Sequence, residues 1–293
     1  MYFRKILFPV AFSEAAAAMA CSVREMAQRF NATVTLLNAC NFAPEYISGP
    51  ALDAPCDSKE RLLMLSPELQ EMRNQQKRRL VEFARTHFAG IVHTERIEIG
   101  DSAAVIEWVA KCEEADLIMM PSRGVGRFRR LLPGSVTSKV LPGVMCPVWT
   151  KFHRSETVSA LPLRYRSILC VVGMNREDDI VFDVASLFAQ IFGSRICFLY
   201  PHFTSDEENT EFISQSVKQA FDRVCVAARR QITTDVFVRI LRSNTAEGIR
   251  QIALEQGVEL TIVGRGREGG SFSRGLSQLY VIIRESSCPV LSV

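Results

Sequence analysis

The stretch ADLIMMPSRG, residues 115–124, joins an unbroken apolar run to a polar end that contains glycine. The apolar run shows no alternation of polar and apolar residues, which is typical of a β-strand that is covered on both faces. Such strands belong mainly to parallel sheets, whose strands are connected by helices packed on the two faces. The stretch therefore predicts a parallel α/β sheet, with a loop directly after one of its buried strands.

A second copy of this stretch, VELTIVGRGR, lies at residues 258–267. Three more pairs of stretches match in the same order along the chain: KILFPVAFS (5–13) with SILCVVGMN (167–175), ATVTLLNAC (32–40) with SRICFLYPH (194–202), and CPVWT (146–150) with CPVLSV (288–293). Matches that recur in one order at similar spacing indicate an internal duplication. We therefore expect two tandem α/β domains, residues 1–152 and 163–293, and a linker in the polar, proline-containing segment 151–166.

Helix signals alternate with the strand-like runs. In the first copy, helices are expected to begin at Ser13, at Ser66 followed by Pro67, at Asp101 or Ser102, and at Ser135. In the second copy, Asn244 or Thr245 is expected to cap a helix that ends before Gly257. This alternation is typical of doubly wound domains, in which ligands bind at the carboxyl ends of the strands where the winding reverses. The first copy also carries an insertion, residues 41–68, which suits a lid, a contact surface or a disordered loop equally.

Composition excludes several classes of protein. The chain of 293 residues is 47% hydrophobic and has a net charge of +3, so it is globular, and neither nucleic acid nor a membrane surface is an expected partner. No apolar run approaches the roughly 20 residues of a membrane-spanning helix. The nine cysteines are scattered without a CxxC pair, which favours a cytoplasmic protein with buried thiols and no metal site.

The loop after the strand of the opening stretch reads SRGVGRFRRLLPGSV, residues 122–136. It is not a P-loop, because no lysine precedes Ser135. It is not a dinucleotide fingerprint, because Gly124 and Gly126 lack a third glycine and follow the fourth strand. With these two motifs excluded, the loop still contains a glycine turn, and a Gly-Ser pair stands where a helix is expected to begin. Backbone N–H groups at a helix start can bind an anion, and glycine lets the backbone approach it closely.

This pattern resembles that of the universal stress protein family, over nearly the whole chain taken as a tandem pair. ATP-binding members carry the pattern G-x2-G-x9-G-(S/T) at this place. Gly124, Gly134 and Ser135 match it at the right spacing, whereas Pro121 stands at the first glycine. The CPV runs are also similar. The resemblance implies the α/β sandwich fold of the family, binding of ATP together with Mg²⁺, and pairing of the two halves through their last strands, with a homodimer left open.

The resemblance also implies a nucleotide site in the first copy. Its residues lie at the ends of the first two strands, in the loop and at the helix start: Ala11, Ala39, Ser122, Arg123, Gly124, Gly126, Arg127, Gly134, Ser135, Val136 and Thr137. Ala11 stands where the family usually has an Asp that contacts the adenosine portion, and losing such a charge-assisted partner costs about 1.5–3 kcal/mol. In the second copy, Gly173 replaces the Asp and Arg267 replaces a motif glycine, so this copy is expected to be degenerate.

Catalysis is not expected. The loops offer no base or nucleophile placed for phosphoryl transfer, and the sequence contains no GxSxG, HExxH or paired-carboxylate arrangement. We therefore expect a regulatory, ATP-binding or nucleotide-binding protein of the stress response rather than an enzyme. The alternative is a nucleotide-free interaction scaffold of the same fold, which the losses at Ala11 and Pro121 favour.

Overall fold

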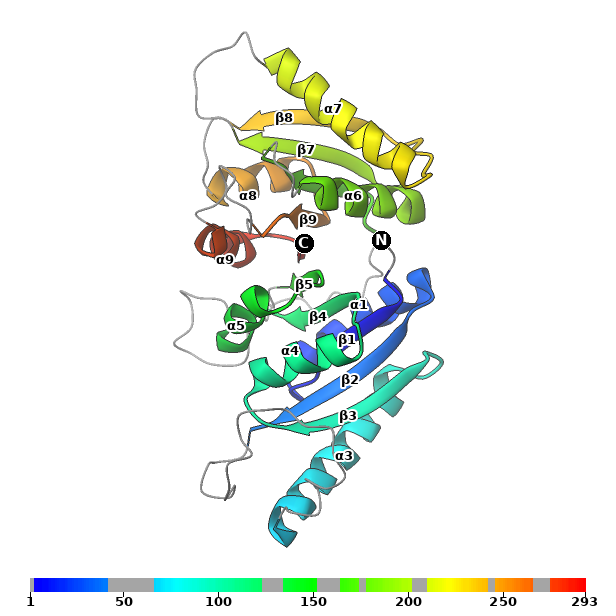
Figure 1. Ribbon diagram of the computed structural model, residues 1–293, viewed down its shortest axis with the longest axis vertical. Helices are drawn as coiled ribbons and strands as arrows, with labels where there is room; N and C mark the ends of the chain where they lie inside the picture. The colour runs from blue at the N-terminus through cyan, green and yellow to red at the C-terminus, as the bar shows by residue number, and fades with distance from the viewer. Residues whose placement is uncertain are drawn as a thin grey trace.

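The computed structural model describes residues 3–41, 66–122, 134–151, 164–173, 178–201, 210–241, 246–265 and 275–293. Strands and helices alternate along both halves of the chain (Figure 1). The first half contains β1 (Lys5–Pro9), α1 (Glu14–Phe30), β2 (Thr33–Cys40), α3 (Pro67–His87), β3 (His93–Ile99), α4 (Ser102–Cys112), β4 (Leu117–Pro121), α5 (Ser135–Gly143) and β5 (Val148–Lys151). The second half contains β6 (Ser167–Val171), α6 (Asp178–Phe192), β7 (Arg195–Pro201), α7 (Thr210–Ala227), β8 (Val236–Leu241), α8 (Ala246–Glu255), β9 (Leu260–Val263), α9 (Gly275–Glu285) and β10 (Val290–Ser292).

The strands that the structure describes belong to one ten-stranded sheet with the order β3-β2-β1-β4-β5-β10-β9-β6-β7-β8. The strands within each half are parallel. Each half is therefore a doubly wound α/β unit, as the sequence predicts. The winding reverses between β1 and β4 in the first half and between β6 and β9 in the second, and these are the places where such sheets bind ligands.

The two halves meet where β5 and β10, the last strand of each, pair antiparallel within the one chain. Val290 lies opposite Thr150, Leu291 opposite Trp149, and Ser292 opposite Val148. The sheet consequently runs through the molecule without a break, and the helices beside this junction, α5 and α9, lie next to each other (Figure 1).

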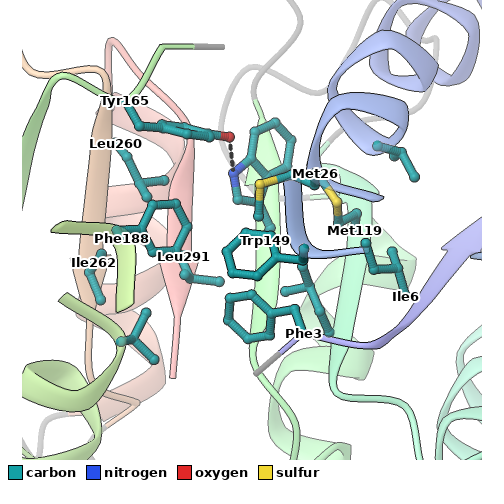
Figure 2. Packing of buried hydrophobic residues seen from close by; sticks show 14 of the residues in the cluster. Phe3, Ile6, Met26, Met119, Trp149, Tyr165, Phe188, Leu260, Ile262 and Leu291 are labelled. Atoms are coloured by element: carbon teal, nitrogen blue, oxygen red, sulfur yellow. Dashed lines mark hydrogen bonds between the residues drawn. The ribbon is translucent and has the colours of Figure 1, made fainter. Parts of the chain in front are cut away.

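Apolar side chains cover both faces of the sheet. One face packs against α1, α3, α6 and α7, and the other packs against α4, α5, α8 and α9. At the junction, Trp149 and Leu291 are buried together with Phe3 and Phe188 from the two halves (Figure 2). The same cluster includes Tyr165, whose hydroxyl oxygen accepts a hydrogen bond of 3.0 Å from the Trp149 indole N–H. The junction is thus part of a common hydrophobic core.

The predicted helix starts are confirmed where the structure describes them. The Ser13 hydroxyl accepts from the N–H of Ala16, the Ser66 hydroxyl accepts from that of Leu69, and α5 begins at Ser135. Gly257 lies just beyond α8 in the left-handed region, with φ of 58°. Asn244, Thr245 and most of the insertion, residues 42–65, lie outside the described residues.

The structure describes only the two ends of the segment expected to be a linker, and both ends are part of the packed domains. Lys151 is the last residue of β5, and its carbonyl accepts from the N–H of Ser122. Tyr165 is fully buried in the core at the junction. The composition of the segment gives no sign of these two contacts, because the partner in each contact lies outside the segment.

Among the helices that the structure describes, none has the length and apolar character that a membrane-spanning helix needs.

Candidate functional site

A pocket of about 190 Å³ lies at the carboxyl ends of β1, β2 and β4. Its lining comes from these strand ends, from the cap of α1, and from the first turns of α4 and α5: Pro9, Val10, Ala11, Ser13, Leu37, Asn38, Ala39, Ser102, Ile106, Met120, Pro121, Gly134, Ser135, Val136 and Thr137. The pocket is therefore at the point where the winding of the first half reverses. Within the described residues, none of these lining side chains is charged, so the attraction for an anion that they show comes from backbone dipoles and neutral donors.

The start of α5 supplies such dipoles. Its N-cap residue is Gly134, and no side chain of the described residues caps the helix. By contrast, Ser13 and Asp101 cap α1 and α4. The first N–H groups of a helix have no partners within the helix, and with the helix dipole they favour a bound anion. The uncapped start of α5 thus gives this neutral pocket a region that suits phosphate.

Ser122 lies behind this helix start. Its carbonyl accepts from the N–H of Gly134 at 2.6 Å, and its side chain is buried, with the residue 1% exposed. Within the described part of the chain, the Ser122 hydroxyl has no hydrogen-bond partner. Leaving a buried hydroxyl unpaired costs about 1–3 kcal/mol, which a water or ligand oxygen can offset. Ser122 is not part of the pocket lining, so it borders the pocket only through Pro121 and Gly134.

Six residues predicted from the sequence come together in this lining: Ala11, Ala39, Gly134, Ser135, Val136 and Thr137. Ala11 is exposed and Ala39 is half-buried. The Thr137 hydroxyl donates to the carbonyl of Pro121 at 3.3 Å, so its proton is used within the protein. The predictions at Arg123, Gly124, Gly126 and Arg127 lie outside the described residues.

Asn38 and Ser102 also line the pocket, and neither was predicted from the sequence as a site residue. Asn38 is 7% exposed, and its side-chain N–H donates to the carbonyl of Val10 at 2.8 Å, which ties the end of β1 to β2. Asn38 could have been found from the sequence, because it is a polar residue inside the apolar run TLLNAC. Ser102 opens α4, but nothing local to it shows that α4 points at β1 and β4.

The matching place in the second half differs. The N–H of Gly173, after β6, donates to both carboxylate oxygens of Asp178 at 3.1 Å. Asp178 begins α6 and is 5% exposed. A buried carboxylate at this strand end opposes a bound anion. Arg267, predicted to disrupt the second loop, lies outside the described residues.

Comparison with known proteins gives one family. The model of the "Universal stress protein family" matches residues 2–150. A universal stress protein of Methanocaldococcus jannaschii is 27% identical over 146 residues, which cover 50% of this chain and 80% of that protein.

Solved structures match the chain over almost its whole length, and two of them are universal stress proteins by name. A universal stress protein from Archaeoglobus fulgidus has a TM-score of 0.70 at 20% identity, covering 99% of this chain and 97% of that one. A putative universal stress protein from Pseudomonas aeruginosa has a TM-score of 0.59 at 15% identity, covering 99% of this chain and 93% of that one. At these identities, the two structures show a shared fold.

Proposed function

This chain belongs to the universal stress protein family, and on that basis we propose that its first half binds ATP or a related adenine nucleotide in the pocket at the ends of β1, β2 and β4. The supporting observation is the start of α5, which meets this pocket without a side-chain cap. Phosphate oxygens would accept from the N–H groups of this first turn. The apolar walls, including Val10, Ile106 and Met120, suit the flat faces of a base.

In this proposal, Mg²⁺ would be bound together with the nucleotide. The described residues include no group of three or more His, Cys, Asp or Glu side chains that could hold a metal. Mg²⁺ keeps several waters and is commonly bound through substrate phosphates, so the phosphates would be its main ligands here. With a neutral pocket lining, we infer that the protein acts by binding, as a regulator in the stress response, rather than by catalysis.

Isothermal titration with Mg-ATP tests the proposal. We expect heat of binding at micromolar to millimolar ligand, and no heat at millimolar ligand would reject it. Ser135→Asp gives the matched variant, since Ser135 is exposed at the first position of α5. An acid there stabilises the helix start but repels phosphate, so affinity should fall about tenfold or more while the melting temperature holds or rises. Ser135→Asn is the neutral control for size, and its affinity should fall much less than that of Ser135→Asp.

A second candidate function is that of a nucleotide-free scaffold. Ala11 favours it, because the lining has no carboxylate for the ribose hydroxyls. The two functions are distinguished by heat-denaturing the purified protein and chromatographing the supernatant. Adenine nucleotide released in proportion to protein would rule out the scaffold, whereas its absence together with a flat titration would favour it.

A further inference from the structure

The second half of the molecule supplies one hydrogen bond to α5, the helix that starts at the pocket. α5 contains Pro142, which has no N–H and so cannot donate to the carbonyl four residues earlier, that of Ser138. The hydroxyl of Tyr280, on α9 of the second half, donates to this carbonyl at 2.7 Å. A side chain of one half therefore supplies the hydrogen bond that the sequence of α5 removes.

Arg265 holds the far end of the same helix. It follows β9, and it is only 4% exposed although it is charged. Its guanidinium donates to the carbonyls of Leu141, at 3.2 Å, and Val144, at 2.6 Å. It also donates to that of Cys146, at 2.5 Å. These carbonyls lie at the carboxyl end of α5 and in the turn to β5, where a positive charge complements the helix dipole.

Arg265 occupies the place in the second copy that Ser122 has in the first, as the match of VELTIVGRGR with ADLIMMPSRG shows. The backbones agree: the Ser122 N–H donates to the carbonyl of Lys151, and the Arg265 N–H donates to that of Val293. The side chains differ. The Ser122 side chain is a small buried hydroxyl, whereas the Arg265 side chain reaches across the junction into the first half. The two copies therefore share the backbone at this position but differ in the side chain and its contacts.

We propose that Arg265 and Tyr280 are positioning residues for the site in the first half. They hold α5 from its middle and its carboxyl end, so that the N–H groups of its first turn stay aimed at the pocket. A helix as short as α5, interrupted by proline, depends on such tertiary contacts. This inference rests on the proposed function as far as the ligand is concerned, but its structural part can be measured without one.

Two variants test it. Tyr280→Phe removes one hydroxyl, and Arg265→Gln removes the charge and most of the donors. Amide hydrogen exchange in the ligand-free protein should be faster in both variants at Ser138, whose N–H donates to the carbonyl of Gly134, and at the next amides of α5, by about 2- to 10-fold for the loss of one hydrogen bond. Mg-ATP should bind about fivefold more weakly to Tyr280→Phe, and about tenfold or more to Arg265→Gln.

Tyr165→Phe is the control, because Tyr165 also makes a hydrogen bond at the junction, to Trp149, without touching α5. It should leave exchange in α5 and ATP affinity unchanged even where it lowers the melting temperature. Pro142→Ala added to Tyr280→Phe restores a donor for the Ser138 carbonyl and should bring exchange back toward the wild-type rate.

The outcomes separate the positioning role of Arg265 and Tyr280 from the proposed binding of ATP. Wild-type exchange rates in α5 of both variants, or an equal effect of Tyr165→Phe, overturn the positioning role. Suppose that the wild-type protein gives no heat with ATP while amide exchange in α5 is faster in the two variants. In that case the proposed function is wrong, but the second half still stabilises α5.

Discussion

Ala11 is the residue on which the strength of the site depends. It is exposed at the end of β1 and lines the pocket, and its methyl group offers no hydrogen bond to a ligand. The other lining side chains are uncharged as well. Among the described residues, a nucleotide at this place would be held by backbone amides, neutral donors and apolar contact, and its affinity would be lower than with a carboxylate partner at this position.

Ala11→Asp should strengthen nucleotide binding. A carboxylate here can accept hydrogen bonds from ribose hydroxyls, and such a charge-assisted bond contributes about 1.5–3 kcal/mol, or roughly 10- to 100-fold in affinity. Titration with Mg-ATP measures the change, and Ala11→Asn separates the charge from the added bulk. Binding no tighter in Ala11→Asp than in Ala11→Asn would place the ligand elsewhere.

At the scale of single elements, the helices around the pocket start in different ways. α4 is capped by Asp101, whose carboxylate accepts from the N–H groups of Ala103 and Ala104. The same carboxylate pairs with Lys139 of α5 at 3.2 Å. The backbone N–H of Ala104, with lesser help from Lys139, lowers the pKa of Asp101 below its usual 3.8. The starts of α4 and α5 are thereby tied together beside the pocket.

This lowered pKa predicts a pH dependence of stability. Because the folded pKa lies below the unfolded one, the charge of Asp101 stabilises the fold above about pH 4, and this stabilisation is lost as the pH falls through the folded pKa. Asp101→Asn keeps a good cap but removes the charge, and should cost about 0.5 kcal/mol at pH 7, since the side chain is half exposed. Melting both proteins between pH 7 and 3 should show the difference shrinking at the acid end of the range. A constant difference would contradict it.

At the scale of the whole molecule, the pairing of β5 with β10 makes the two halves one hydrophobic unit. Leu291 on β10 is fully buried and packs in the same cluster as Trp149 on β5 (Figure 2). Separating the halves would expose these side chains and the paired strand edges. We therefore expect the halves to stabilise each other.

Leu291→Ala should lower the free energy of unfolding of the whole chain by about 2–5 kcal/mol, in a single transition. Urea unfolding followed by tryptophan fluorescence and circular dichroism measures this, because Trp108 reports on the first half, Trp149 reports on the junction, and circular dichroism reports on both halves. Leu254→Ala, at an exposed site on α8, is the control and should cost less than about 0.5 kcal/mol. Two separated transitions, with the first half unaffected by Leu291→Ala, would show that the halves fold independently.

The sequence by itself determined the features that depend on local pattern. Apolar runs without alternation predict the buried strands, and Ser13, Ser66 and Asp101 predict helix starts, because a cap bonds to N–H groups only two or three residues away. The repeated order of these signals predicts two similar halves. Since parallel strands all end at the same edge, the position of the loop after β4 was also predictable. The loop's own residues, and the identity of the ligand, stay predictions.

Only the tertiary structure decided which distant groups meet. Tyr165 looked like part of a polar linker, yet its ring fills the junction against Trp149. Arg265 looked like one more loop arginine, yet it reaches carbonyls as far as 124 positions away along the chain. Neither contact leaves a periodic or local signal, because its partner is set by the antiparallel pairing of β5 with β10. That pairing brings α9 and the end of β9 against α5, and so connects the second half to the pocket of the first.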